Sequence, residues 1–353
     1  MNEHCHSRRE DLLDPANRES LLGILKGIGG VAIAGVGMVG LLGCDGPQSA
    51  LDPAGRAAEQ IARLFWKMAA GTVLVWLIMA GLTFYATRGQ KPVQERRLAK
   101  LLIIGGGAVI PTLILTVLLL YGLAMMPHLL ARAPEGTLKI AVTGEQWWWR
   151  VRYQLPEGGE VVLANEIRLP LGEATEFSLE SSDVIHSFWI PALGGKMDMI
   201  PGRTTRLLLE PTRAGIFRGV CAEYCGTSHA LMAFSVVVMP PEEFQRWLAD
   251  QKLPAREPID LVAAKGRESF FTNGCSACHT VRGTSADGVV GPDLTHVGSR
   301  TTIGAGIFPN EPRAFYRWVE RTHELKPGVQ MPHFGMLPPQ ELHAIATYLE
   351  SLQ

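Results

Sequence analysis

Charged side chains are scarce in this sequence of 353 residues: Asp, Glu, Lys and Arg make up only 19% of it, whereas hydrophobic residues make up 47%. The formal net charge is −1, so the chain lacks the basic excess that proteins use to neutralise nucleic acid phosphates. We therefore expect no nucleic acid partner. Low charge combined with high hydrophobicity is typical of a protein that is partly embedded in a membrane.

Cysteine is also rare, with six residues in the whole chain. Four of them form two close pairs, Cys221 with Cys225 and Cys275 with Cys278, and a histidine follows each pair. This arrangement indicates cofactor chemistry rather than a disulfide framework. Disulfide frameworks are typical of much shorter, cysteine-rich chains. Cys5 has no partner that the sequence identifies.

Two long runs contain no charged residue. Met68–Thr87 has 20 residues and Leu101–Met126 has 26, and about 20 apolar residues are enough for a helix to cross a bilayer. A buried core helix rarely lacks charge over such a length. Pro111 lies inside the second run, which is common in spans that pack against other helices. We therefore expect residues 44–134 to hold a linker and a two-helix transmembrane hairpin.

The link between the two runs, Arg88–Lys100, carries five basic residues and one acid. Basic loops of this kind stay in the cytoplasm. Both outer ends of the hairpin and everything after Met126 are then expected on the opposite side. We expect a membrane protein whose functional domains lie on the extracytoplasmic side.

A shorter, glycine-rich apolar stretch, Gly27–Gly43, ends directly before Cys44 in the sequence LLGC. An apolar stretch before a cysteine suggests a secretory signal whose removal leaves a lipidated Cys44. The leader before it is long, and its basic residues are offset by acids, so an uncleaved anchor is the alternative. In either case residues 1–43 form a signal or anchor segment.

From residue 135 to about residue 250 the pattern changes to short alternating runs interrupted by glycine and proline. Runs such as LKIAVTG, EVVLANEIRL and FSVVVM predict the strands of an all-β sandwich. The stretch CAEYCGTSHALM, residues 221–232, lies between two such strands and contains Gly226. We expect a loop there, although the spacing of its ligands would also suit one face of a helix.

This stretch holds four soft or borderline metal ligands: Cys221, Cys225, His229 and Met232. Such a set suits copper, and two thiolates held this close could bridge two ions. Each copper would then need one histidine, and His186, at a strand end upstream, is the best second candidate. A redox disulfide would explain neither the histidine nor the methionine, and zinc has little use for a thioether.

These residues carry a family resemblance. Together with SDVIHSFWIP, GGKMDMIPGR and GEQWWWRVRY after a two-helix hairpin, the stretch 221–232 resembles subunit II of cytochrome c oxidase. The resemblance implies a cupredoxin-like domain with a dinuclear copper (CuA) centre. Its bridging thiolates would be Cys221 and Cys225, its terminal imidazoles His186 and His229, and its weak ligands Met232 and the backbone carbonyl of Glu223.

The resemblance implies three further features. The side chain of Glu223 would help bind a magnesium ion at the interface with subunit I. Trp147 would pass electrons from a donor to the copper centre, with core packing as the alternative role of this indole. Many family members carry a carboxylate shortly before the proline of the second span, but LLIIGGGAVIP contains no acid, so we do not transfer a proton-uptake role.

After a linker at about Lys252–Ile259, residues 260–353 contain the pattern Cys-x-x-Cys-His, which is the attachment signal of c-type haem. Cys275 and Cys278 would bind the haem covalently, and His279 would be the proximal iron ligand. Zinc sites and redox pairs share this short pattern, but no second cysteine pair follows. GPDLTHVG follows where a class I cytochrome c has its proline loop, so we expect an all-α class I cytochrome c domain.

The second axial ligand has four candidates in the sequence. The stretch VQMPHFGM resembles the Met-Pro-x-Phe motif of class I cytochromes c, which selects Met331, with His333 as the main rival. Methionine in this position raises the reduction potential of the haem. The remaining candidates are His296 and Met336.

Together these features predict a multidomain membrane protein that carries electrons. The architecture resembles the caa-type oxidase subunit II, which has a fused C-terminal cytochrome c domain. The resemblance implies that electrons from a cytochrome c-type donor pass through haem c and the dinuclear copper centre to subunit I. There, in a complex with other oxidase subunits, dioxygen would be reduced to water with proton translocation.

Two functions of other classes are alternatives. A copper chaperone or thiol oxidoreductase that uses Cys-x-x-x-Cys would have a thioredoxin-like βαβ pattern and no haem. The sequence lacks this pattern and contains a haem attachment motif. A membrane-anchored electron shuttle that works without an oxidase would have the same sequence features. Purification with or without subunit I would separate that shuttle from an oxidase subunit.

Overall fold

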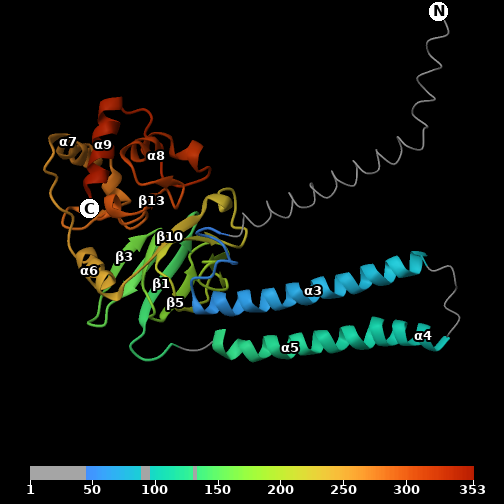
Figure 1. Ribbon diagram of the computed structural model, residues 1–353. Coiled ribbons are helices and arrows are strands. Elements are labelled where there is room, and N and C mark those ends of the chain that lie inside the picture. The colour runs from blue at the N-terminus through green and yellow to red at the C-terminus, as the bar shows by residue number, and fades with distance from the viewer. Residues whose placement is uncertain (1–44, 89–95, 130–132) are drawn as a thin grey trace, which may run out of the picture.

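The computed structural model describes residues 45–88, 96–129 and 133–353. Along the chain it consists of two long helices, a β-sandwich and a helical C-terminal domain (Figure 1). These parts agree with the expected fold class, which combines a two-helix hairpin, an all-β sandwich and a helical C-terminal domain. Cys5, Cys44 and the segment 1–43 lie outside the described residues.

The two long helices correspond to the two uncharged runs. The first is α3 (Arg56–Arg88); the second consists of α4 (Arg96–Lys100), a π-helical stretch η1 (Leu101–Val109) and α5 (Ile110–Leu129). Both are long and apolar enough to cross a membrane. They lie side by side, with Lys67 Nζ 3.4 Å from the Tyr121 hydroxyl.

The π-helical stretch was not predicted. Three consecutive glycines, at positions 105–107, weaken the preference for a regular α-helix. Pro111 follows shortly afterwards and lacks the backbone N–H that an α-helix would use. Both features favour a change of helical geometry, and the N–H of Ile110 bonds to the carbonyl of Gly105.

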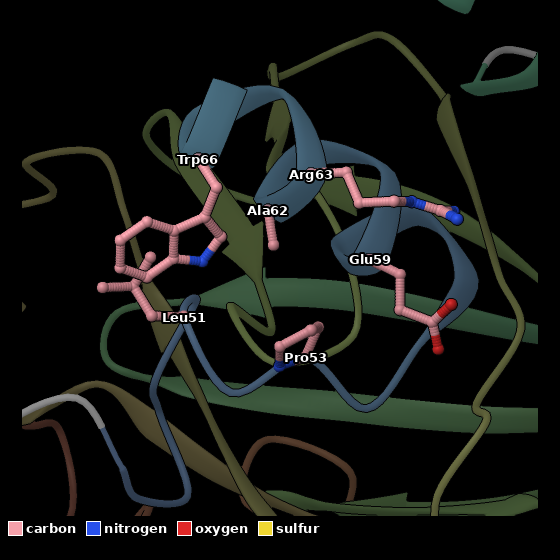
Figure 2. Close-up of a pocket in the computed structure, with 6 residues that line it drawn as sticks. All are labelled: Leu51, Pro53, Glu59, Ala62, Arg63 and Trp66. Atoms are coloured by element: carbon pink, nitrogen blue, oxygen red, sulfur yellow. The ribbon is translucent and has the colours of Figure 1, made fainter. Parts of the chain in front are cut away.

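The start of α3 is anchored to the sandwich. Arg213 binds the carboxylate of Asp52 at 2.8 and 2.9 Å, and this hydrogen bond holds the pKa of Asp52 below its ordinary value. Gly55 lies so close to the backbone of Leu193 that a Cβ would meet the carbonyl oxygen at 2.4 Å. A cavity of about 250 Å³ lies beside this junction (Figure 2), lined by Leu51, Pro53, Glu59, Ala62, Arg63 and Trp66.

The sandwich contains two five-stranded sheets. The first has the order β3-β2-β1-β5-β8 and the second the order β4-β10-β9-β6-β7. Buried residues alternate along β1, as the pleat of a half-buried strand requires. The strands of the first sheet are β1 (Leu138–Glu145), β2 (Trp148–Gln154), β3 (Glu160–Ala164), β5 (Thr175–Ser181) and β8 (Thr205–Leu209). Those of the second are β4 (Glu166–Pro170), β6 (His186–Trp189), β7 (Met197–Met199), β9 (Gly215–Cys221) and β10 (Ala233–Met239).

The run EVVLANEIRL, expected as one strand, is divided between the two sheets. Asn165 separates β3 from β4 and adopts a φ of 60°, a left-handed conformation that asparagine tolerates better than most residues. Its side-chain Oδ1 accepts a hydrogen bond of 2.8 Å from the backbone N–H of Trp149. This bond stabilises the crossing from one sheet to the other.

Aromatic side chains fill the space between the sheets. Trp149 packs edge-on against Phe188 and Phe234, with ring centroids 5.8 and 5.1 Å apart, and the two phenylalanines stack at 4.8 Å. Helix α6 (Pro241–Gln251) follows the last strand and buries Phe244 and Leu248 against this core.

The C-terminal domain is built on three helices: α7 (Leu261–Thr272), α8 (Pro312–Leu325) and α9 (Pro339–Ser351). Asp260 caps α7 by accepting hydrogen bonds from the N–H groups of residues 262 and 263. Helices α7 and α9 cross at Gly266, where a Cβ would meet the Ala344 carbonyl at 1.9 Å. The remaining short elements are η3 (Cys275–Ala277), β11 (Thr280–Val281), β12 (Ala286–Asp287), η4 (Val297–Ser299), β13 (Thr302–Ile303) and β14 (Phe308–Pro309).

The C-terminal domain contacts the sandwich directly. On β4, the carboxylate of Glu166 accepts hydrogen bonds from the N–H and the hydroxyl of Thr301 at 2.6 and 2.8 Å. At the start of β10, the N–H of Ala233 donates to the carbonyl of Ala305 at 3.1 Å. The interface therefore lies along the sheet edge and strand end that adjoin the loop 221–232.

Candidate metal centre and cofactor cavity

The cysteine-rich stretch is a loop, as predicted. Cys221 is the last residue of β9, Met232 immediately precedes β10, and only the short turn η2 (His229–Leu231) is helical. His186 is the first residue of β6, and Phe188 of the same strand pairs with Cys221. This pairing brings the distant histidine to the start of the loop.

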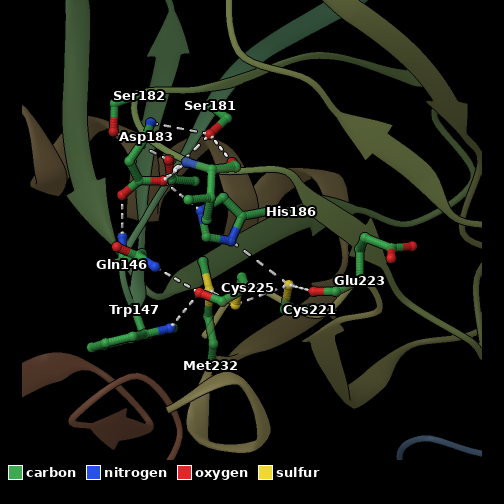
Figure 3. Close-up of polar contacts among 12 residues, drawn as sticks. Gln146, Trp147, Ser181, Ser182, Asp183, His186, Cys221, Glu223, Cys225 and Met232 are labelled. Atoms are coloured by element: carbon green, nitrogen blue, oxygen red, sulfur yellow. Dashed lines mark hydrogen bonds and ion pairs between the residues drawn. The ribbon is translucent and has the colours of Figure 1, made fainter. Parts of the chain in front are cut away.

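Two sulfur atoms lie at the centre of the loop (Figure 3). Cys221 Sγ and Cys225 Sγ are 3.8 Å apart, which is too far for a disulfide. His186 Nδ1 is 3.8 Å from the first sulfur, and His229 Nδ1 is 3.5 Å from the second. Each imidazole therefore accompanies a different cysteine.

Two weaker donors lie beside the same sulfur atoms. The thioether of Met232 is 3.8 Å from Cys225 Sγ, and the carbonyl oxygen of Glu223 is 3.2 Å from Cys221 Sγ. The carboxylate of Glu223 instead lies 3.7 Å from Lys196 Nζ, and 46% of the Glu223 side chain is exposed. The backbone and the side chain of Glu223 can thus contact different partners.

The surroundings of Cys221 favour its thiolate form beside His186. The hydrogen bond with Cys225 lowers the pKa of the Cys221 thiol, and His186 adds to this effect. The same hydrogen bond, together with burial, raises the pKa of Cys225. Burial lowers the pKa of His186, but its hydrogen bonds with Cys221 and Asp183 outweigh burial, so the pKa is raised overall. Thiolate is the form of cysteine that binds metals.

Asp183 orients His186. Its Oδ1 lies 2.8 Å from His186 Nε2, and its Oδ2 accepts a hydrogen bond of 2.7 Å from the N–H of Gln146. With Nε2 engaged by the carboxylate, Nδ1 faces the cysteines. Carboxylate–histidine pairs of this kind set the orientation and basicity of metal-binding imidazoles.

Trp147 is bonded to the loop itself. Its indole Nε1 donates to the carbonyl of Cys225 at 3.0 Å, and Gln146 Nε2 donates to the same oxygen at 2.7 Å (Figure 3). The side chain is only 7% exposed. Trp147 therefore combines the core packing considered from the sequence with a direct contact to the backbone of a candidate ligand.

A cavity of about 420 Å³ lies in the C-terminal domain and reaches the sandwich. Cys275, Cys278, His279 and Met331 all line it, together with apolar side chains of α7, α8 and α9. The same cavity is also lined by Trp147 of the sandwich domain. A volume of this size is in the usual range for a cofactor site.

The proximal histidine is held in one orientation. His279 Nδ1 donates to the carbonyl of Pro292 at 2.8 Å, which leaves Nε2 free to act as a ligand. Burial lowers the pKa of His279, so the neutral, ligating form is favoured. Gly291 packs against this ring, because a Cβ there would lie 2.6 Å from Cε1.

The four candidates for the second axial ligand lie in different places. Met331 lines the cavity. His296 Nε2 is engaged by the carbonyl of Leu253 at 3.0 Å. His333 is exposed beside His323, with ring centroids 5.4 Å apart, and Met336 is 70% exposed.

The donor sets fit the two expected cofactors. Two close sulfurs with one imidazole each and flanking thioether and carbonyl donors suit a pair of copper ions. An apolar cavity with two cysteines, an oriented histidine and a methionine suits a c-type haem.

Comparison with known proteins agrees with this arrangement. Residues 154–239 match the family described as cytochrome C oxidase subunit II, periplasmic domain. The chain is also 34% identical over 157 residues to cytochrome c oxidase subunit 2 of Branchiostoma floridae, and this match covers 39% of the chain and 68% of that relative. The chain belongs to the cytochrome c oxidase subunit II family.

This subunit II also carries a cytochrome c domain. Residues 263–353 match the family described as cytochrome c. The two matches lie in one chain in this order, so the expected caa-type fusion is confirmed. The extracytoplasmic position expected for the sandwich also agrees with the periplasmic domain that the family description names.

Bacterial relatives extend the comparison. The chain is 37% identical over 219 residues to cytochrome c oxidase subunit 2 of Alkalihalophilus pseudofirmus, covering 62% of each protein. It is 32% identical over 232 residues to that of Bacillus subtilis, covering 63% of this chain and 64% of the relative. The match therefore spans somewhat more than three fifths of each of these relatives.

A solved structure is similar to part of this chain. The periplasmic domain of subunit II of cytochrome oxidase of Bradyrhizobium japonicum shares 32% sequence identity. The match covers 34% of this chain and 97% of that structure, with a TM-score of 0.32.

Proposed function

We propose that this chain is the electron-accepting subunit II of a respiratory, caa-type cytochrome c oxidase. It takes electrons from a cytochrome c-type donor at haem c and passes them through a dinuclear copper centre to subunit I, where dioxygen is reduced to water with proton translocation. Membership of the family, with both redox domains in one chain, supports the proposal.

The loop 221–232 provides the copper ligands in this proposal. Cys221 and Cys225 act as bridging thiolates, each next to one terminal imidazole, His186 or His229. The 3.8 Å separation of the two sulfurs supports this role, because sulfurs that share a metal ion at about 2.3 Å lie less than about 4.6 Å apart. Met232 and the carbonyl of Glu223 would be the weak ligands. Bound copper supplies reversible one-electron chemistry, and the buried loop holds its ligands in place.

The C-terminal cavity holds haem c in the proposal. Cys275 and Cys278 would attach it covalently, and His279 and Met331 would be the iron ligands. The structural observation that supports Met331 is its place in the cavity wall, which His296, His333 and Met336 do not share.

Trp147 connects the two sites in the proposal. It lines the haem cavity and donates a hydrogen bond to the carbonyl of Cys225. It therefore lies between a candidate iron ligand and a candidate copper ligand. We assign to it the transfer of electrons from the chain's own haem domain to copper.

The proposal also includes the setting of the protein. The two long helices anchor the chain in a bacterial inner membrane, beside subunit I and other oxidase subunits. The half-exposed carboxylate of Glu223 is available for a magnesium ion shared with subunit I, and its backbone carbonyl remains directed at Cys221.

The test is metal and haem analysis of the complex purified in detergent, followed by rapid reduction with a cytochrome c-type donor. We expect subunit I to copurify, with two coppers and one haem c for each copy of this chain. Absorbance should show haem c reduced first and the copper centre second. Purification without subunit I would instead favour a free electron shuttle, and copper reduction that bypasses the haem would contradict the proposed order.

A further inference from the structure

A tight turn joins α8 to Met331. It consists of Lys326–Val329, with the sequence KPGV, and is called the KPGV turn below. The N–H of Val329 bonds to the carbonyl of Lys326 at 3.4 Å, and Gly328 has a φ of +85°. Proline followed by glycine at the two central positions is typical of a type II β-turn. Met331 follows two residues after the turn.

The first half of the turn binds the copper loop by two hydrogen bonds. Lys326 Nζ donates to the carbonyl of Leu231 at 2.8 Å. In the opposite direction, the hydroxyl of Ser228 donates to the carbonyl of Pro327 at 2.7 Å. Ser228 is only 1% exposed, so both bonds are sheltered from water.

The second half of the turn packs on the sandwich. A Cβ at Gly328 would lie 2.8 Å from Cη2 of the Trp147 ring. Glycine is thus required for close approach as well as for its positive φ. Val329 packs against the hydrophobic core of the sandwich domain.

Lys326 is an unusual residue for this position, because its side chain is only 2% exposed. Both acceptors of its ammonium group are backbone carbonyls: Leu231 of the copper loop and Gly304 of the C-terminal domain, the latter at 3.2 Å. Burial lowers the pKa of Lys326 to about 7, and the charge of Cys225 acts in the opposite direction. A buried amine keeps its hydrogen bonds only while the two domains are in contact, since separation removes one acceptor.

The contacts of the turn lie next to candidate ligands of both sites. In the copper loop, Ser228 precedes His229 and Leu231 precedes Met232. On the other side, the turn leads directly to Met331. One element of four residues therefore contacts the copper loop and lies two residues before a candidate iron ligand.

We propose that the KPGV turn is a latch that positions the haem domain on the copper loop, with Lys326 as its positioning residue. This inference rests on the proposed function, because it concerns transfer from haem to copper within the chain. Electron tunnelling weakens exponentially with separation, so a small displacement of one site relative to the other slows transfer. Loss of the latch should leave each site intact and impair only the step between them.

The test compares full-length, cofactor-loaded oxidase with Lys326→Met, which keeps the length of the side chain but removes its donors. After rapid photoreduction of haem c, we expect transfer to copper to slow by about tenfold or more, because loss of buried, charge-assisted hydrogen bonds weakens the contact between the domains and lets the two sites move apart. Donor-to-haem reduction, the haem potential, the sulfur-to-iron absorption band and the copper EPR signal should stay unchanged. These readouts separate positioning from a general loss of folding.

Lys252→Met is the matched control. Lys252 pairs with Glu157 at 2.5 Å beside the interdomain linker, but both side chains are largely exposed. Exposed ion pairs contribute little to stability, so haem-to-copper transfer should stay within about twofold of the wild-type rate. A tenfold loss in this control would overturn the special role of Lys326.

A second variant keeps the test decisive if Lys326→Met loses haem or copper. Ser228→Ala removes one hydrogen bond from the other side of the same contact, and slower haem-to-copper transfer would support the latch. A wild-type rate of haem-to-copper transfer in Lys326→Met would overturn the latch. If that variant does not assemble, a wild-type rate in Ser228→Ala would overturn it. Absence of haem-to-copper transfer in the wild-type complex would instead contradict the proposed function.

Discussion

The indole of Trp147 donates a hydrogen bond of 3.0 Å to the carbonyl of Cys225. The other side of the same ring faces Gly328, two residues before Gln330 and three before Met331. This side chain therefore fills the space between the copper loop and the KPGV turn. Trp147 is only 7% exposed, so it offers little surface to an external protein.

Trp147→Phe should slow transfer from haem c to copper by at least about tenfold, because the variant loses the hydrogen bond and part of the aromatic contact. Gln146 still donates to the Cys225 carbonyl at 2.7 Å, so the copper EPR signal should survive. Flash photoreduction of the purified complex measures the rate. A wild-type rate in this variant would limit Trp147 to packing.

Cys221→Ser and Cys225→Ser should each destroy the dinuclear copper site and spare the haem, because a hydroxyl cannot bridge two coppers as a thiolate does. Donor reduction of haem c should continue, and onward transfer to the oxidase should stop. EPR spectroscopy and copper analysis provide the measurement. A normal two-copper signal in either variant would remove the assignment.

Met331→Ala should leave haem covalently attached but lower its reduction potential, since thioether ligation favours ferrous iron. The ferric protein should lose the weak near-infrared sulfur-to-iron band, and copper content should not change. Redox titration with optical spectroscopy checks both effects.

His333→Ala is the matched comparison for Met331→Ala. His333 is exposed beside His323, so its loss should change the haem spectrum little. If His333→Ala abolished six-coordinate haem while Met331→Ala did not, the domain would be a bis-histidine cytochrome.

Gly291→Ala should disturb the proximal histidine, because a Cβ would lie 2.6 Å from Cε1 of His279. Overpacking of this kind costs about 1–3 kcal/mol, and the haem should become partly five-coordinate while staying covalently bound. Gly195→Ala, where the nearest atom would be 3.9 Å away, is the control and should behave as wild type. Optical spectra of both variants decide, and an unchanged Gly291→Ala spectrum would exclude His279 as a closely packed ligand.

Cys44 should be lipidated after removal of residues 1–43, as the apolar run that ends in LLGC indicates. Intact-mass analysis of the purified subunit should show the shortened chain plus acyl groups. An unmodified chain that still begins near Met1 would favour the uncleaved anchor.

The parts of this protein that depend on local chemistry could be predicted from the sequence. Hydrophobicity over about 20 residues is enough to indicate a span, and alternation with a period of two residues indicates a strand. The close spacing of Cys221, Cys225 and His229 indicates the metal loop without any knowledge of the fold. The same holds for the haem attachment pattern at Cys275, Cys278 and His279.

Other features depended on contacts between distant residues. The division of EVVLANEIRL at Asn165 follows from a hydrogen bond to Trp149 in a different strand. The sequence favoured Met331 over His333 through a motif, but it could not show which of the two side chains enters the haem cavity. Both lie in one short segment, and only packing places Met331 in the cavity wall.

The sequence by itself thus determined the identity and order of the modules, since hydropathy, strand period and ligand spacing are properties of neighbouring residues. Only the tertiary structure decided how the two redox domains meet. That interface depends on backbone carbonyls, such as those of Leu231 and Gly304, and on the shape of a glycine turn against one indole ring. Carbonyls are present in every residue and leave no pattern in the sequence, so the role of Lys326 emerges only when the chain is folded.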